Sequence, residues 1–261
     1  MNRDERLNAL LELLAVRGRI DVEDIAAELA VSGATIRRDL DHLAGQRLLT
    51  RTRGGAVAHS VAYGLPVRYR SVRRAGEKRR IGVAAAGLVV RGAVVGLNGG
   101  TTTTEVARAL VGSAEVGGED GAELITVVTN ALNIANELAV RPQVKLVVTG
   151  GVARPQSYEL VSPLAGRILG GLSLDVTFLG VDAIDPDAGA SAHHEGEADV
   201  DRLLAERAGK VVVVADSSKI GVRAFASVCG IASVHVLVTD TGADEGDVRR
   251  FVDRGVEVVL V

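Results

Sequence analysis

The sequence has few of the residues that build disulfides, aromatic cores or membrane spans. Cys229 is the single cysteine among 261 residues, so no internal disulfide can form and a reducing compartment is expected. Aromatic residues make up 2% of a chain that is 47% hydrophobic, which predicts an aliphatic core. No apolar run approaches the roughly 20 residues of a transmembrane helix, and Met1 is followed by polar residues instead of a secretory signal. We therefore expect a cytoplasmic protein with no membrane partner.

The net charge of −3 conceals a strong asymmetry along the chain. Residues 1–80 hold 16 Lys and Arg against 10 Asp and Glu, whereas residues 81–261 hold 14 against 23. Within the first part, residues 37–80 hold 12 basic and 3 acidic groups. A cationic module on an acidic body is typical of a protein that binds a polyanion at one end. A basic linker without a partner would give the same charge pattern.

One stretch, residues 32–43, predicts an amphipathic helix with a basic outer face. Ser32 is expected to cap it, because a serine hydroxyl accepts hydrogen bonds from the free amides of a first helical turn. Ile36, Leu40 and Leu43 are four and three residues apart, which places them along one apolar stripe. The opposite face carries Ala34, Arg37, Arg38 and Asp41. Small residues let a helix end enter a DNA groove, and arginine binds phosphate or guanine, although most arginine pairs on exposed faces are simply solvated.

The residues around this helix complete the pattern of a winged helix-turn-helix. The leucines of residues 4–17 fall on one helical face, and Asp21 begins a second helix. A short hairpin or wing is expected after the basic helix. In it Arg51 and Arg53 are two residues apart and therefore on one side of a strand. Residues 1–57 are predicted to form this domain.

Two segments of this domain resemble a known family. Thr35-Ile36-Arg37-Arg38-Asp39-Leu40 and Arg51-Thr52-Arg53-Gly54-Gly55-Ala56 are similar to the N-terminal signature of the DeoR family of bacterial transcriptional regulators. The resemblance implies that the helix beginning at Ser32 enters the DNA major groove, with Thr35, Arg37 and Arg38 as the main contacts. Asp39 is expected to orient an arginine. The full set of expected DNA-binding residues is Ser32, Ala34, Thr35, Arg37, Arg38, Arg51 and Arg53.

The rest of the chain predicts a linker and then a larger α/β domain. Residues 58–76 show little periodicity and suggest the linker, and residues 77–261 alternate between helical and strand patterns. Such alternation is typical of a mostly parallel sheet with helices on both faces. Helices are expected at 77–90, 104–110, 131–139, 161–169, 197–208 and 245–254. Strands are expected at 93–97, 125–129, 145–149, 176–181, 211–215, 234–239 and 256–261.

Polar and glycine-rich residues follow several of the predicted strands. Open α/β sheets bind ligands beyond the carboxyl ends of their strands. After the first strand, residues 98–104 read Asn-Gly-Gly-Thr-Thr-Thr-Thr and open a helix, so backbone amides and hydroxyls could surround a phosphate monoester. The loop matches neither a P-loop nor a dinucleotide-binding pattern, and a purely structural turn remains an alternative. Later strands are followed by Asn130, by Gly150-Gly151 with Arg154, by Asp182 and by Lys219.

The order of these motifs resembles the effector domain of the DeoR family, which is related in fold to ribose-5-phosphate isomerase and glucosamine-6-phosphate deaminase. The resemblance implies a sensor for a phosphorylated sugar or related metabolite, with phosphate at residues 99–103. Asp182, Glu197 and Lys219 would stand where the related enzymes place acid–base and anion-binding groups. The first strand ends in Asn98, where the family usually has aspartate. The expected ligand-binding residues are Asn98, Gly99, Gly100, Thr101, Thr102, Thr103, Asn130, Arg154, Asp182, Glu197 and Lys219.

No metal and no cofactor are expected. His193-His194-Glu195 offers adjacent side chains without further ligands at metal-binding spacing, so a histidine that binds the effector or lines a loop is the better interpretation. Cys229 lies among small apolar residues and suggests packing rather than catalysis.

The preferred hypothesis is a transcriptional regulator, with no enzymatic activity and with repression as its usual mode. It would bind a duplex operator as a homo-oligomer under the control of a phosphorylated effector. One alternative is a sugar-phosphate isomerase or deaminase with a DNA-binding appendage. Another is a metabolite-binding protein whose helix-turn-helix contacts a protein partner.

Overall fold

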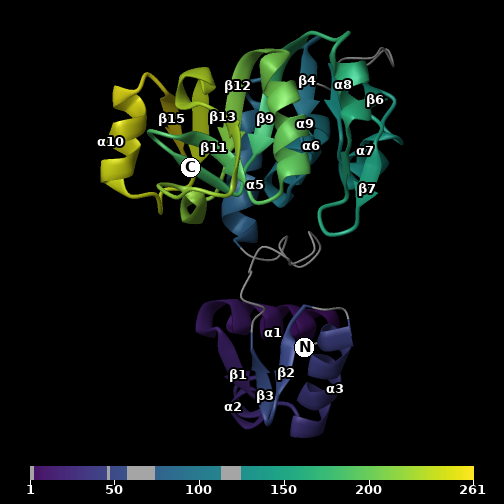
Figure 1. The fold of residues 1–261 in the computed structure, drawn as a ribbon, viewed down its shortest axis with the longest axis vertical. Coiled ribbons are helices and arrows are strands. Elements are labelled where there is room, and N and C mark those ends of the chain that lie inside the picture. The colour runs from purple at the N-terminus through teal and green to yellow at the C-terminus, as the bar shows by residue number, and fades with distance from the viewer. Residues whose placement is uncertain (1–2, 46–47, 58–73, 113–124) are drawn as a thin grey trace. The chain divides into compact units, whose positions relative to one another are not determined.

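The computed structural model describes residues 3–45, 48–57, 74–112 and 125–261 (Figure 1). The chain divides into two compact units, Met1–Arg73 and Arg74–Val261. Residues 74–76, which the sequence assigned to the linker, lie in the second unit, and the rest of the expected linker lies outside the described residues. Among the described residues, no helix is both long and apolar enough to cross a membrane.

The first unit is a winged helix-turn-helix, as the sequence predicts. Its helices are α1 (Arg3–Arg17), α2 (Val22–Glu28) and α3 (Gly33–Gly45), and its strands are β1 (Arg19–Asp21), β2 (Thr50–Thr52) and β3 (Gly55–Val57). The strands form an antiparallel sheet in the order β1-β3-β2. Leu10, Ile25 and Leu40, one from each helix, are fully buried in a shared aliphatic core. Asp21 caps α2 by accepting a hydrogen bond from the Glu23 amide at 3.1 Å.

The second unit is built on a seven-stranded, all-parallel sheet in the order β15-β14-β12-β9-β4-β5-β6. The strands are β4 (Val94–Leu97), β5 (Ile125–Thr129), β6 (Val144–Val148), β9 (Leu174–Gly180), β12 (Ala208–Val214), β14 (Val236–Thr239) and β15 (Glu257–Leu260). The helices are α5 (Ala75–Ala86), α6 (Thr101–Gly112), α7 (Leu132–Leu138), α8 (Pro163–Leu169), α9 (Glu195–Glu206) and α10 (Glu245–Asp253).

Helices cover both faces of this sheet. One core lies between the sheet and helices α5, α6 and α7, and a second lies between the sheet and helices α8, α9 and α10. Successive valines of one strand enter opposite cores, since Val211 and Val213 face the second core while Val212 and Val214 face the first. This alternation explains the continuous apolar runs that predicted strands buried on both faces. Helices α6 and α9 accordingly lie on opposite sides of the sheet in Figure 1.

The strand order reverses direction between β4 and β9. Strands β4, β5 and β6 follow one another toward one edge, whereas β9, β12, β14 and β15 extend from β4 toward the other edge. Ligands of open α/β sheets bind at the carboxyl ends of the strands beside such a reversal. The fold therefore places the loops after β4 and β9 at the centre of the expected ligand-binding edge.

The sequence missed two small antiparallel elements. Strands β7 (Val152–Arg154) and β8 (Glu159–Val161) form a hairpin, and β10 (Ala183–Asp185), β11 (Gly189–Ala192) and β13 (Ala226–Cys229) form a three-stranded sheet. The prediction that residue 161 begins a helix is wrong. Val161 ends β8, and α8 begins at Pro163 because proline suits a first helical position that needs no amide donor. Ser162 caps this helix at the Leu164 amide, 3.2 Å away.

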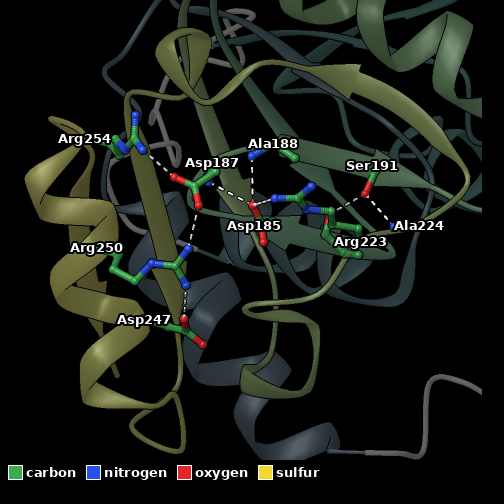
Figure 2. A network of polar contacts seen from close by, with 10 residues as sticks. Asp185, Asp187, Ala188, Ser191, Arg223, Ala224, Asp247, Arg250 and Arg254 are labelled. Carbon is green, nitrogen blue, oxygen red and sulfur yellow. Dashed lines mark hydrogen bonds and ion pairs between the residues drawn. The ribbon is translucent and has the colours of Figure 1, made fainter.

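A network of ion pairs joins the small sheet to α10 (Figure 2). Arg250 donates to Asp187 at 2.7 Å, and Arg254 contacts the same carboxylate. Arg223 donates to Asp185 at 2.9 Å, while the amides of Asp187 and Ala188 donate to that oxygen as well. Burial alone would raise the pKa of Asp185, but these hydrogen bonds outweigh it and lower the pKa. The carboxylate therefore stays ionised and fixes the turn between β10 and β11.

Candidate nucleic-acid interface and effector site

Helix α3 presents the predicted basic face to solvent. The Ser32 hydroxyl lies 3.2 Å from the Thr35 amide and 2.9 Å from the Thr35 hydroxyl, so Ser32 caps the helix as expected. Thr35 itself is partly exposed. The exposed positions on this face are Ala34, Arg37, Arg38 and Asp41, as the periodicity predicted. The helix thus offers a small residue at its start and two guanidinium groups behind it.

Asp39 turns away from this face and into the unit. Its side chain is buried, and it accepts a hydrogen bond from Arg6 of α1 at 2.5 Å. The prediction that Asp39 orients an arginine is confirmed, although that arginine belongs to α1 and had not been singled out. Because the carboxylate is buried and paired, its charge is removed from the surface that would meet DNA.

The two wing arginines occupy different environments. Arg51 donates to Asp41 of α3 at 2.8 Å and to the Gly55 carbonyl at 2.5 Å, so it ties the wing to the basic helix. Arg53 is exposed in the turn between β2 and β3, where Gly54 has a φ of +85°. The expectation that both arginines lie on one side of a strand is wrong, because β2 ends at Thr52.

Asn98 joins three elements at the expected ligand-binding edge of the sheet. Its side-chain amide donates to the Gly180 carbonyl and to Asp201, both at 2.8 Å, and its oxygen accepts from the Gly180 amide at 2.8 Å. These bonds connect the end of β4 to the end of β9 and to α9. Both amide hydrogens of Asn98 are therefore used within the protein, and its role in the structure is that of a cross-link.

The glycine-threonine loop starts α6 as predicted. Gly99 is buried and Gly100 has a φ of +144°, a conformation that favours glycine. The hydroxyls of Thr103 and Thr104 donate to the Gly100 carbonyl at 3.1 and 2.6 Å. Thr102 is buried and Thr101 is partly exposed. The first amides of an α-helix have no partner within the helix, so the start of α6 can bind an anion through its backbone.

Two cations lie at the same edge, each beside a carboxylate. Arg154 of β7 donates to Glu197 of α9 at 3.2 Å. Lys219, in the short helix η2 (Ser217–Lys219) after β12, lies 3.7 Å from Asp182, which follows β9. The other oxygen of Asp182 accepts from the His193 amide at 2.9 Å. The predicted residues are thus brought together in pairs from distant parts of the chain.

Two further acids, missed by sequence reasoning, complete the site. Glu159 of β8 accepts from Asn130 at 3.1 Å and packs so closely on Gly99 that an added Cβ there would lie 2.2 Å from its Cγ. Asp201 lies one helical turn after Glu197, and this four-residue spacing on one helix face could have revealed it. No periodic signal marked Glu159, because its strand is three residues long.

Asp201 is buried among these acids. Burial and the negative charge of Glu159 raise its pKa well above that of an ordinary aspartate, against the lowering effect of the hydrogen bond from Asn98. Glu197 and Asp182 raise it further. One of its oxygens has no hydrogen-bond partner among the described residues. The protonated form is therefore favoured, which reduces the repulsion between the four acids.

Replacing Asp201 by asparagine is expected to remove one source of pH-dependent stability. Above about pH 4 an unfolded aspartate has lost its proton, whereas folded Asp201 retains it up to its raised pKa. The free energy of unfolding therefore falls as pH rises through this window, by at most about 1.4 kcal/mol per pH unit. Asp201→Asn should flatten that decline in thermal melts recorded between pH 4 and 8.

The matched control is Asp199→Asn, because Asp199 lies on the same helix and its side chain is 66% exposed. The control should keep the wild-type dependence of melting temperature on pH. A decline equally steep in wild type and Asp201→Asn would contradict the assignment of the retained proton to Asp201.

The described histidines and the cysteine do not form a metal site. Within the described ranges no group of three His, Cys, Asp or Glu side chains is suited to hold a metal ion. His194 precedes α9, and its Nδ1 is buried without a hydrogen-bond partner among those residues. Burial raises the pKa of Cys229 to about 11, so its thiol stays protonated at neutral pH.

Comparison with known proteins decides what kind of protein this is. A family model described as the DeoR C-terminal sensor domain matches residues 73–241, and one described as a DeoR-like helix-turn-helix domain matches residues 6–61. The chain belongs to the DeoR family. It is accordingly a DNA-binding transcriptional regulator with a sensor domain for a small-molecule effector. This membership sets aside the two alternatives, an enzyme with a DNA-binding appendage and a helix-turn-helix used for a protein partner.

Relatives align over nearly the whole chain. The regulator GlpR of Haloferax volcanii is 35% identical over 98% of this chain and 96% of its own length. The repressor GlcR of Bacillus subtilis is 30% identical over 100% of this chain and 97% of its own length. The glycerol-3-phosphate regulon repressor of Escherichia coli K12 is 28% identical over 100% of both chains.

Two solved structures show more distant likeness. Ribose-5-phosphate isomerase A from Neisseria gonorrhoeae is 20% identical with a TM-score of 0.39, over 54% of this chain and 52% of the isomerase. The full-length sorbitol operon regulator SorC from Klebsiella pneumoniae is 13% identical with a TM-score of 0.40, over 96% of this chain and 99% of SorC.

Proposed function

We propose that this DeoR-family regulator is a cytoplasmic repressor that is controlled by a phosphorylated sugar or polyol. The observation that carries the proposal is the meeting of an anion-binding helix start with two cations and four acids at the carboxyl edge of the sheet. Relatives named as repressors, including one of a glycerol-3-phosphate regulon, support the same class of effector.

The chemistry of this edge suits a ligand with one anionic end and several hydroxyl groups. The start of α6 offers backbone amides to a phosphate, and Lys219 or Arg154 would add a charge-assisted hydrogen bond. Because each cation is paired with a carboxylate, a phosphate would compete with that partner. A displaced carboxylate of Asp182 or Glu197 would then accept hydrogen bonds from sugar hydroxyls.

On the DNA side, we propose that α3 enters the major groove. Ala34 allows close approach, while Arg37 and Arg38 are exposed and would reach phosphates or base edges. Arg53 at the tip of the wing suits the sugar-phosphate backbone. Since one such module reads few base pairs, we propose that a homo-oligomer binds a repeated or inverted operator.

A thermal-shift screen tests the effector assignment. The purified protein is tested with glycerol 3-phosphate, ribose 5-phosphate and hexose 6-phosphates, each beside its unphosphorylated form. A ligand that binds only the folded protein raises the melting temperature. We expect one phosphorylated compound to give a shift that its unphosphorylated form lacks. No shift across the panel would contradict the assignment.

Lys219→Ala is expected to weaken binding of that compound by roughly tenfold to a hundredfold, since a hydrogen bond to a charged group contributes about 1.5–3 kcal/mol. Titration calorimetry on wild type and variant measures the change. The matched control is Lys145→Ala, because Lys145 is exposed near the amino end of β6. Equal affinities of Lys219→Ala and wild type would remove Lys219 from the site.

A further inference from the structure

Arg74, the first residue of the second unit, reaches the carboxyl edge of the sheet. Its Nη1 atom lies 2.8 Å from the Ser217 hydroxyl, and its guanidinium lies 3.7 Å from Asp216 and 4.0 Å from Asp240. Asp216 follows β12 and Asp240 follows β14, and both are almost fully buried. Arg74 thus supplies positive charge to two buried carboxylates at an edge otherwise occupied by the candidate effector site.

The contact is made to the short segment that carries Lys219. Ser217 and Lys219 are the two ends of the three-residue helix η2. Its geometry is held by hydrogen bonds within the turn, since the Lys219 amide donates to the Asp216 carbonyl at 2.9 Å and the Ile220 amide donates to the Ser217 carbonyl at 3.2 Å. A displacement of Lys219 would therefore move Ser217 with it.

The opposite ends of η2 face different partners. At one end Lys219 lies beside Asp182, where a phosphate would compete for its ammonium group. At the other end Ser217 binds Arg74. Three residues thus connect the candidate effector site to the point at which the chain enters the second unit.

Arg74 is also held by the start of α5. Its carbonyl accepts a hydrogen bond from the Lys78 amide at 3.0 Å, and its φ of +51° is uncommon for a residue other than glycine. The covalent chain continues directly from Arg74 to residue 73, the last residue of the unit that contains the DNA-binding helix. Arg74 is therefore the first described residue after the segment that leads from that unit.

We propose that Arg74 couples effector binding to operator affinity, by linking the Lys219 segment to the end of the connection from the DNA-binding unit. In this scheme a bound phosphate draws Lys219 from Asp182, η2 shifts, and the contact between Ser217 and Arg74 changes. The effector thereby favours one of two arrangements of Arg74, as differential binding requires. The inference rests on the proposed function, because it assumes an effector at Lys219.

The test separates effector binding from effector response. An operator duplex is first selected from random DNA with the wild-type protein. The probe is glycerol 3-phosphate, or the compound of the screen that gives a larger thermal shift. Effector affinity is measured by calorimetry, and operator affinity is measured by fluorescence anisotropy at fixed salt, with and without saturating effector. Arg74→Ala removes the guanidinium, and Ser217→Ala removes the same hydrogen bond from the other side without changing the charge.

Arg79→Ala is the matched control, because Arg79 is an exposed arginine on the same helix, α5. In wild type and control we expect the effector to change operator affinity about fivefold or more. In Arg74→Ala and Ser217→Ala we expect this change to shrink toward none, while effector affinity stays within about threefold of wild type. Ser217→Ala keeps the test valid if Arg74→Ala folds poorly.

Two results would overturn the inference. If both variants respond to the effector as wild type does, Arg74 does not couple the two activities, and the proposed function stands without it. If no compound binds the wild-type protein, or none changes its operator affinity, the proposed function fails and the coupling scheme fails with it.

Discussion

Leu40→Ala is expected to lower the melting temperature of the first unit sharply and to weaken operator binding with it. Leu40 is fully buried between the three helices of that unit, and truncation of a buried leucine costs about 2–5 kcal/mol. A domain of this size has a total stability of roughly 3–8 kcal/mol, so the substitution would remove about half of that stability or more. The second unit has its own two cores and should keep its structure. Circular dichroism melts and anisotropy titrations with the operator measure both effects.

Arg38→Ala is the matched variant on the same helix, and it should weaken operator binding by a different route. Arg38 is exposed, so its removal leaves the core intact. Loss of one arginine contact to DNA costs about 1–3 kcal/mol, or roughly fivefold to 150-fold in affinity. Operator affinity unchanged at controlled salt in Arg38→Ala would exclude Arg38 from the interface. A Leu40→Ala protein with an unaltered melt would contradict the assignment of the core.

Gly99→Ala is expected to weaken effector binding by displacing Glu159 and the start of α6. An added Cβ would lie 2.2 Å from Cγ and 2.4 Å from Cδ of Glu159, and these atoms cannot give way without moving the whole side chain. Glu159 would lose its contact with Asn130, and the start of α6 would shift. Such overpacking costs about 1–3 kcal/mol. Effector affinity, measured by calorimetry, should fall at least about tenfold.

Gly112→Ala provides the comparison, because Gly112 ends the same helix and an added Cβ there meets no atom of the described residues within 4 Å. It should leave effector affinity unchanged and should stabilise the protein by up to about 1 kcal/mol, since alanine loses less backbone entropy than glycine on folding. If Gly99→Ala bound the effector as tightly as Gly112→Ala does, the α6 loop would be a structural turn only.

The regular elements could be predicted because local patterns determine them. The run Ile125–Thr129 of β-branched residues was predicted as a strand, and β5 has the same bounds. The capping serine and the apolar stripe likewise located α3. Strand β11 (Gly189–Ala192) has no such pattern, since glycine, alanine and serine favour no strand by themselves. It forms because it pairs on one side with β10 and on the other with β13.

The candidate site was predictable in position but only partly in detail. Parallel topology brings the ends of β4, β5, β9 and β12 to one edge, so the residues after them could be grouped from sequence alone. The hydrogen bonds of Asn98 could not be predicted from sequence, because its partners Gly180 and Asp201 are 82 and 103 residues away. The contact between Arg51 and Asp41 spans only 10 residues, but it depends on how the wing folds back against α3, which no local pattern specifies.

The lone cysteine makes this protein a convenient starting point for site-directed labelling. Cys229 is only partly accessible, and its raised pKa of about 11 leaves almost no thiolate at neutral pH. Thiol reagents should therefore prefer a cysteine introduced at an exposed position over the native one. Spin labels at exposed sites such as Arg53 and Arg79, one in each unit, could report how the distance between the units responds to effector and operator. The native Cys229 need not be replaced first.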